Sequence, residues 1–350
     1  MNKTTIEELI EKQAWCLSEK VEHTKNRIKE FYEYTQGKCF IAFSGGIDST
    51  ILLHIARSVY PDIKAVFSNT TNEYPELIKF VKTFDNVEIV YPDMNFKKVI
   101  EKYGFPFVSK KVSRAVYKLR SPKDNTANLR HLFLKGVNRK GQKTPSYKLA
   151  KKWYFLLDKE ATTFDITSIC CDILKKKPMA DYVKKNKLFP ILGTLASESN
   201  QRKENYVKYG CNIYGSKEPK ARPMSIWNDR DIWDYIKINN VNYCSLYDEL
   251  VLKDGTVVKA EKTTGCVGCG MGCSLEEDNR FERLRLRNPK HFKNLMKIEN
   301  NGVSFADAYN HTFNIEKKYK NKKYQEKVFE KGLQDLVGLD IEARKIGKAK

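Results

Sequence analysis

The sequence contains no apolar run that approaches the length of a membrane span, and its opening residues mix acidic and basic side chains. The start of the chain therefore does not resemble an export signal, and we expect a cytoplasmic protein without a membrane partner. Histidine is scarce, with 5 residues that show no metal-ligand spacing. The 9 cysteines are an odd number, so a disulfide framework is not expected.

Basic residues are in clear excess. The 64 Lys and Arg residues outnumber the 43 acidic residues, which gives a formal net charge of +21. Such an excess favours an anionic partner, either a nucleotide or nucleic acid. AT-rich codon usage would produce the same excess of lysine, so charge alone leaves the interpretation open. The length of 350 residues, of which 41% are hydrophobic, is enough for one large domain or two.

Short apolar segments and amphipathic segments alternate along much of the chain. A helix is predicted first, over residues 1–36, and the alternation then runs from "KCFIAF" to "KLFPILGT". This spacing is typical of βαβ units, so it predicts an α/β fold with a doubly wound parallel sheet. The predicted parts are an N-terminal helix (1–36), a nucleotide-binding domain (37–219), a smaller, mostly helical, cysteine-containing region (220–300) and a basic helical tail (301–350).

A basic insertion, predicted over residues 116–152, interrupts the alternation. Asp124 is its one acidic residue, and the aromatic residues Phe133, Tyr147 and Trp153 lie within it or beside it. One interpretation is a clamp on a nucleic acid backbone, with bases stacked on the aromatic rings. The other is a solvated helical lid over an active site. The basic tail would offer nucleic acid a second contact.

The stretch "SGGIDST", residues 44–50, follows a predicted strand and opens a predicted helix. Gly45 and Gly46 allow main-chain N–H groups to approach an anion, and the helix N-terminus adds free N–H groups and a favourable dipole. Asp48 would repel phosphate unless Mg²⁺ bridges the two, and helix capping is its structural alternative. Hydroxyl donors come from Ser44, Ser49 and Thr50. The stretch therefore predicts a phosphate-binding loop.

Other polar residues follow predicted strands, where ligands bind in open α/β sheets. Arg202 is a candidate for binding an α-phosphate or a sulfate, and a surface ion pair is its alternative. Glu198, Ser199 and Asn69 are candidate nucleotide contacts, and for Asn69 simple helix capping is the alternative. Cys211 follows Arg202 closely in the sequence, where neighbouring cations would activate a thiolate nucleophile; a buried strand residue is its alternative.

The loop resembles the pyrophosphate loop of the ATP pyrophosphatases, which have an adenine nucleotide α-hydrolase fold and cleave ATP between the α and β phosphates. Further segments resemble the phosphoadenosine phosphosulfate (PAPS) reductase family in order: "VFSNTTNEYPELIKF", "GFPFVSKK", "CCDILKKKP", "GTLASESNQR", "RPMSIWNDRDIWDYI" and "TGCVGCGMGC". The resemblance implies ATP as a ligand, Mg²⁺ on Asp48, and adenylation of an acceptor in sulfur chemistry. Nucleic acid is one candidate acceptor, and a thiol or sulfur-donor protein is a candidate partner.

The sequence departs from the PAPS reductases in two respects. Those enzymes have a degenerate phosphate loop and carry a Glu-Cys-Gly-x-His segment, whereas this chain keeps Asp48 and Ser49 and lacks that segment. A Mg²⁺-bound pyrophosphate leaving group needs the intact loop, so adenylation with Asp48 and Arg202 as catalytic residues is the first prediction. The alternatives are an adenosine phosphosulfate (APS) or PAPS reductase, and a nucleic-acid-binding component of a modification or defence system.

Two groups of cysteines resemble the four-iron four-sulfur ligand set of the APS reductases. The expected ligands are the pair Cys170 and Cys171 with the later Cys266 and Cys269. Adjacent cysteines strain the geometry of a single cluster, so substitutes are considered among Cys273, Cys211 and Cys244. Thiolates suit iron–sulfur or zinc; an iron–sulfur cluster is predicted, and the alternatives are a structural zinc site and a loop without metal.

Overall fold

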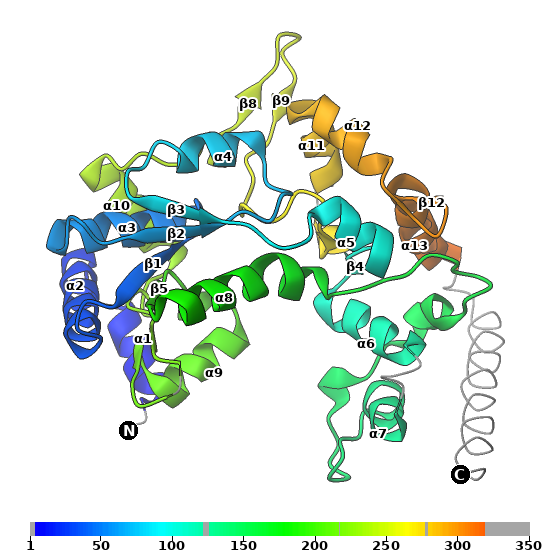
Figure 1. Ribbon diagram of the computed structural model, residues 1–350, viewed down its shortest axis with the longest axis horizontal. Helices are drawn as coiled ribbons and strands as arrows, with labels where there is room; N and C mark the ends of the chain where they lie inside the picture. Colours follow the sequence, from blue (N-terminus) through cyan, green and yellow to red (C-terminus); the bar gives the residue numbers. More distant parts are fainter. Residues whose placement is uncertain (1–3, 122–125, 217, 277–278, 319–350) are drawn as a thin grey trace. The chain divides into compact units, whose positions relative to one another are not determined.

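The computed structural model describes residues 4–121, 126–216, 218–276 and 279–318 (Figure 1). The chain divides into two compact units, the first made of Met1–Asp93 and Leu174–Cys266 and the second of Met94–Ile173 and Val267–Lys350. No helix in the described ranges is long and apolar enough to cross a membrane.

The first unit is built on a six-stranded sheet with the strand order β3-β2-β1-β5-β7-β6. Figure 1 labels four of these strands, β3, β2, β1 and β5. All neighbouring strands are parallel except β6 and β7, which are antiparallel. The strands are β1 (Cys39–Phe43), β2 (Ala65–Ser68), β3 (Val87–Val90), β5 (Phe189–Leu192), β6 (Asn212–Ile213) and β7 (Lys220–Ala221). The prediction of an α/β fold with a mostly parallel sheet is confirmed.

Helices cover both faces of this sheet. On one face Phe40 and Val66 pack against Tyr182 of α8, and on the other Ile41 and Phe67 belong to the larger apolar core. Strands buried on both faces are apolar at successive positions, which is why "CFIAF" lacks alternation. The helices of this unit are α1 (Ile6–Gln13), α2 (Leu17–Tyr34), α3 (Ile47–Val59), α4 (Pro75–Val81), α8 (Lys177–Asn186), α9 (Asn200–Tyr209) and α10 (Asp229–Asn239), with helical turns at Ala196–Glu198 and Ser245–Tyr247 and a hairpin of β8 (Leu250–Val251) and β9 (Val257–Val258).

The expected single N-terminal helix is two helices, α1 and α2. Cys16 has an extended main chain and caps α2, with its N–H donating to Glu19 Oε2 at 2.8 Å. Thr5 and Glu8 form a capping box at the start of α1. The break lets Leu9 of α1 reach the core, where it is 1% exposed. Local capping therefore overrides the apolar stripe that suggested one continuous helix.

The second unit has short strands and an aromatic core. Phe105, Phe107 and Phe305 pack with ring centroids 5.1 to 5.5 Å apart. Pro289 begins a new helix, so Arg280–Arg287 and Pro289–Met296 are two separate helices. The elements are α5 (Phe96–Tyr103), β4 (Phe107–Val108), α6 (Lys110–Arg120), α7 (Ala127–Arg130), β10 (Gly270–Met271), α11 (Arg280–Arg287), α12 (Pro289–Met296), β11 (Glu299–Asn300), β12 (Val303–Ser304) and α13 (Phe305–Lys318), with helical turns at His131–Lys135, Pro145–Tyr147, Lys151–Leu157 and Cys273–Leu275; the turn Asp172–Lys176 spans the unit boundary. The expected tail beyond residue 318 lies outside the described residues.

The basic insertion belongs to the second unit. Phe133 and Trp153 are buried there, so these two rings are not available for the base stacking that the sequence suggested. Arg120 is structural, because its guanidinium donates to the main-chain oxygens of Phe164 and Thr162 at 2.7 and 3.0 Å. Tyr147 stays 46% exposed. The exposed cations of the insertion include Lys135, Arg139, Lys140, Lys143 and Lys148.

Candidate functional site

Residues 44–46 form the loop between β1 and α3, where the sequence predicts phosphate binding. Gly45 has φ +71°, and a β-carbon there would lie 2.7 Å from Leu77 Cδ1 and 2.8 Å from Val81 Cγ2. Only glycine fits this position. Gly46 is the extended N-cap of α3. The first turn of α3 therefore presents its N–H groups and the positive end of its dipole at the carboxyl end of β1.

Hydrogen bonds made by three hydroxyl groups stabilise this loop. Ser49 Oγ accepts a hydrogen bond from Ser44 N at 3.1 Å and lies 3.0 Å from Ser44 Oγ. Ser49 and Thr50 each donate to the main-chain oxygen of Gly46 at 2.9 Å. Both side chains are buried, whereas Ser44 is exposed. The hydroxyls of Ser49 and Thr50, expected to bind phosphate, thus fix the shape of the loop, and Ser44 is the accessible donor of the three.

Tyr247 and Thr264 contact the loop from a distant part of the sequence, and neither residue was predicted as part of the site. Tyr247 OH accepts a hydrogen bond from Ile47 N at 3.4 Å and lies 3.3 Å from Thr264 Oγ1. A β-carbon on Gly46 would lie 3.0 Å from Thr264 Oγ1 and 3.2 Å from Tyr247 OH. Tyr247 is 200 residues from Ile47 in the sequence. A local motif gives no signal for a contact at that separation.

Asp48 lies half-buried in the first turn of α3. Burial raises the pKa of its carboxyl to about 6, the Asp229 carboxylate adds to the rise, and Arg202 opposes it. Asp229, in the first turn of α10, was not predicted from the sequence. A cation would relieve the repulsion between these two carboxylates. Since Mg²⁺ is typically held by one or two carboxylates together with substrate phosphates, Asp48 and Asp229 fit the Mg²⁺ that the loop implies.

Two guanidinium groups of the same unit, those of Arg202 and Arg222, interact electrostatically. Arg202 forms an ion pair with Glu198 and also acts on the Asp48 carboxyl. Burial lowers the pKa of Arg222, and Arg202 lowers it further. Arg222 Nη1 is buried, and it has no hydrogen-bond partner among the described residues. Neighbouring guanidinium groups that repel each other favour an anionic ligand with several oxygens.

The remaining expected nucleotide contacts have local structural roles. Glu198 accepts a hydrogen bond from a main-chain N–H of its own turn at 3.0 Å. Ser199 caps α9 and accepts from Arg202 N at 3.3 Å. Asn69 Oδ1 accepts from Thr71 N at 2.8 Å, just after β2. Contacts of these three side chains with a nucleotide stay predictions.

The four cysteines expected to hold an iron–sulfur cluster fall in both units. The first unit ends at Cys266, and the second contains Cys170, Cys171 and Cys269. Within the described ranges, no three or more His, Cys, Asp or Glu side chains are arranged to hold a metal ion. The substitute Cys273 is buried, donates to a main-chain oxygen at 2.9 Å, and has a thiol pKa that burial raises to about 11. The ligand set of an iron–sulfur cluster stays a prediction.

Cys211 was expected as a nucleophile activated by neighbouring cations. Burial raises the pKa of its thiol to about 12, although Arg27 and Lys12 act in the opposite direction. The residue is 7% exposed. Burial outweighs the cations, so the thiol stays protonated and we assign it no catalytic role. Cys244, a substitute ligand, is 1% exposed.

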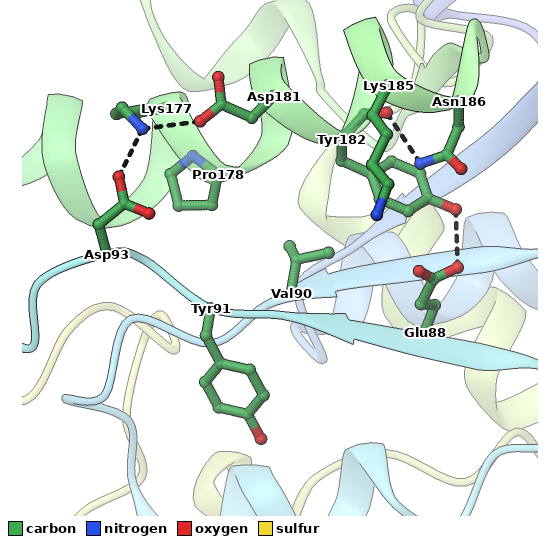
Figure 2. Close-up of a pocket in the computed structure, with 10 residues that line it drawn as sticks. All are labelled: Glu88, Val90, Tyr91, Asp93, Lys177, Pro178, Asp181, Tyr182, Lys185 and Asn186. Carbon is green, nitrogen blue, oxygen red and sulfur yellow. Dashed lines mark hydrogen bonds and ion pairs between the residues drawn. The ribbon is translucent and has the colours of Figure 1, made fainter.

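A cavity of about 310 Å³ lies between the end of β3 and α8. Figure 2 shows Lys177 Nζ between Asp93 Oδ2 and Asp181 Oδ2, at 2.5 and 2.8 Å. Tyr182 OH donates to Glu88 Oε2 at 2.9 Å on the other side (Figure 2). These charged and polar groups are thus paired with one another. No residue expected in the functional site lines the cavity. We assign this cavity no functional role.

Comparisons with known proteins identify the family of this chain. Residues 38–271 match the family model described as the phosphoadenosine phosphosulfate reductase domain. An uncharacterized protein of Methanocaldococcus jannaschii is 24% identical over 264 residues, which are 71% of this chain and 46% of that protein. An adenosine 5′-phosphosulfate reductase of Oceanobacillus iheyensis is 28% identical over 119 residues, 33% of this chain and 42% of that enzyme. The matches thus span less than half the length of each relative.

A solved structure was also found. The phosphate complex of a phosphoadenylyl-sulfate (PAPS) reductase from Candida auris has a TM-score of 0.37 and 12% identity, over 70% of this chain and 91% of that chain. The family model, in contrast, covers most of this chain and all of the loop residues described above. The chain belongs to the phosphoadenosine phosphosulfate reductase family, within the PP-loop superfamily.

Proposed function

We propose that this protein binds Mg²⁺-ATP at residues 44–50, releases pyrophosphate and transfers the adenylyl group to an acceptor in sulfur chemistry. The observation that supports the proposal most is the carboxylate of Asp48 at the start of α3, beside a loop in which Gly45 is sterically required. A half-buried carboxylate repels phosphate in a loop that binds only the anion. A loop that holds a magnesium pyrophosphate leaving group needs one.

The proposed reaction is a displacement at the α-phosphorus. An acceptor oxygen forms a bond to that phosphorus, the bond to the bridging oxygen breaks, pyrophosphate leaves, and the acceptor's proton passes to solvent. Main-chain N–H groups at Gly46 and the start of α3 stabilise the negative charge on the leaving group. Mg²⁺, when bound by Asp48 and Asp229, would neutralise part of the phosphate charge. Arg202 and Arg222 hold the nucleotide oxygens in position.

The second candidate function is reduction of an adenylated sulfate with a thiol donor. The family match and the similarity to an APS reductase favour it, and the pair of Arg202 and Arg222 suits a sulfate as well as a phosphate. APS, PAPS and ATP share an adenosine 5′-phosphate, so the adenosine-side contacts do not separate the two functions. Asp48 separates them, because only the adenylation reaction expels a magnesium-bound pyrophosphate.

Nucleic acid and a sulfur-donor protein are proposed partners of this reaction. The exposed cations of residues 116–152 support nucleic acid as the acceptor, and they would bind its backbone. Without that acceptor role, the same surface would suit a nucleic-acid-binding component of a modification system. The sulfur donor has no structural signature in the described residues.

Calorimetric titration of anaerobically purified protein tests the proposal. Mg²⁺-ATP, APS and PAPS are titrated separately into the wild type and into Asp48→Asn. We expect Mg²⁺-ATP to bind the wild type and to lose its dependence on Mg²⁺ in Asp48→Asn. Binding of APS or PAPS without binding of ATP would instead support the reductase function. AMP serves as a control for the shared adenosine 5′-phosphate contacts, which Asp48→Asn leaves in place.

A further inference from the structure

A second cavity lies in the first unit, outside the loop and its neighbours. It has a volume of about 530 Å³ and is formed by α1, α2, the end of α9 and β6. This volume is in the range of sites that take small organic ligands. None of the residues that we place in the nucleotide site lines it. Its chemistry therefore needs a separate explanation.

The charge on the cavity wall is mainly positive. Lys12, Arg27 and Lys208 line it, against one acid, Glu8. Glu30 forms an ion pair with Arg27 Nη2 at 2.5 Å, so it neutralises part of this positive charge. Both Arg27 and Lys12 act on the imidazole of His23, whose pKa is lowered to about 4 by burial first and then by these cations. The imidazole is neutral at physiological pH, and the two cations give the cavity a positive potential.

Three polar atoms on the lining residues lack hydrogen-bond partners among the residues that the structure describes. They are Arg27 Nε, His23 Nδ1 and Asn212 Oδ1. Asn212 is 9% exposed, and its Nδ2 already donates to the Arg27 main-chain oxygen and to Tyr214 OH, each at 2.8 Å. Buried polar atoms without partners are costly, and such atoms are often completed by a ligand or by water. Here they comprise a cationic donor, an amide acceptor and an imidazole nitrogen.

We propose that this cavity is a second ligand site, which binds a small hydroxylated organic anion such as a sugar phosphate. The anionic group would accept hydrogen bonds from Arg27 Nε and interact with Lys12. A ligand hydroxyl would donate to Asn212 Oδ1, the acceptor that would otherwise stay unsatisfied. The protonated thiol of Cys211, also on the wall, acts as a weak neutral donor. The site does not depend on the reaction proposed for the loop.

Thermal unfolding of the full chain in the presence of ribose 5-phosphate, citrate and inorganic phosphate tests this site. We expect at least one organic anion to raise the midpoint more than inorganic phosphate does at equal concentration. The shift should be lost in Lys12→Ala and in Arg27→Gln. Lys29→Ala removes an exposed charge from the same helix, α2, outside the cavity, and should keep the shift, as should Asp48→Asn.

The His23 imidazole provides a readout that does not rely on stability. Its resonances should shift on addition of the same organic anion in the wild type and should not shift in Lys12→Ala. Absence of a midpoint shift with all three anions would overturn the proposal. Equal loss of the shift in Lys12→Ala and Lys29→Ala would also overturn it, because the effect would then follow net charge. If Arg27→Gln fails to fold, the midpoint shift in Lys12→Ala still tests the proposal.

Discussion

A β-carbon on Gly193 would lie 3.0 Å from the main-chain oxygen of Asp48 and 3.2 Å from Ser49 Cα. The end of β5 therefore runs directly against the first turn of α3, the turn that carries the candidate magnesium ligand. Any side chain at position 193 must displace that turn or the strand end. These two short distances identify Gly193 as a glycine that packs against the first turn of α3, although it lies outside the "SGGIDST" stretch.

Gly193→Ala is expected to weaken binding of Mg²⁺-ATP about tenfold or more, equivalent to about 1.4 kcal/mol. The reason is that the first-turn N–H groups of α3 would move away from the phosphates. Calorimetric titration measures the affinity. Gly141→Ala is the control, because its added carbon meets nothing within 4 Å and it carries only the strain of φ +77°. Equal affinity in the wild type and Gly193→Ala would contradict the assigned role of this turn.

Asp48→Asn should abolish pyrophosphate release and yet stabilise the fold at high pH. The carboxyl has a folded-state pKa of about 6 against an ordinary value of 3.8. An acid with a raised pKa binds protons more tightly when folded, so stability falls as pH rises from about 4 through 6. Removing the charge should therefore raise the unfolding free energy at pH 8 by up to about 3 kcal/mol and change it little at pH 4.

Urea unfolding at pH 4 and pH 8 measures this difference, and a pyrophosphate assay measures activity. In the wild type, activity should decline as pH falls through about 6, since the protonated carboxyl no longer attracts Mg²⁺. A stability gain of equal size at both pH values would mean that the Asp48 charge is not the cause. Unchanged turnover in the variant would exclude the proposed ATP reaction.

The parallel sheet and the strand–loop–helix arrangement around residues 44–50 were predictable from the sequence because their signals are local. A buried strand, two glycines and a helix start are adjacent in "CFIAFSGGIDST". The supporting residues were not predictable, since Tyr247 meets Ile47 only through the fold, at a separation of 200 residues. The hydroxyl of Ser49 also shows the limit of a motif. A serine at this position suggests a hydroxyl that donates a hydrogen bond to phosphate. The Ser49 side chain is buried, however, and its hydroxyl donates to the main-chain oxygen of Gly46 within the loop.

The cysteines illustrate a different limit. Spacing indicates which thiols are candidates, but the protonation of a thiol depends on burial and on distant charges. Arg27 and Lys12 act on Cys211 from elements remote in sequence, and burial still raises its pKa. The expected ligand set is likewise split by the unit boundary after Cys266. Iron and sulfide analysis of anaerobically purified protein is the measurement that decides whether a cluster is present.

Tyr247→Phe should reduce affinity for Mg²⁺-ATP about three- to tenfold. The variant removes the hydroxyl that accepts from Ile47 N and contacts Thr264, and loss of one hydrogen bond costs about 0.5–1.5 kcal/mol. Tyr243→Phe is the matched control, because its hydroxyl donates to Asp248 at 2.8 Å and does not contact the loop. Titration of both variants is the measurement. Equal effects in the two variants would show that Tyr247 does not support the loop specifically.

The exposed cations of the basic insertion allow a test of nucleic acid binding. Replacing Lys140, Lys143 and Lys148 with Ala should weaken binding of a labelled single-stranded oligonucleotide and lower its salt dependence, since each lost phosphate contact removes about 0.7 from the slope of log K against log salt. Fluorescence anisotropy at several salt concentrations measures both quantities.

The control for that experiment replaces the exposed Lys290, Lys293 and Lys297 of the same unit, which changes the net charge equally. Equal losses in the two triple variants would mean that binding follows the overall positive charge and that the insertion has no specific role. If neither variant changes the affinity, the insertion is not a nucleic acid clamp. Its cations would then serve the other interpretation of the segment, a solvated lid, and the acceptor would have to be sought among small molecules.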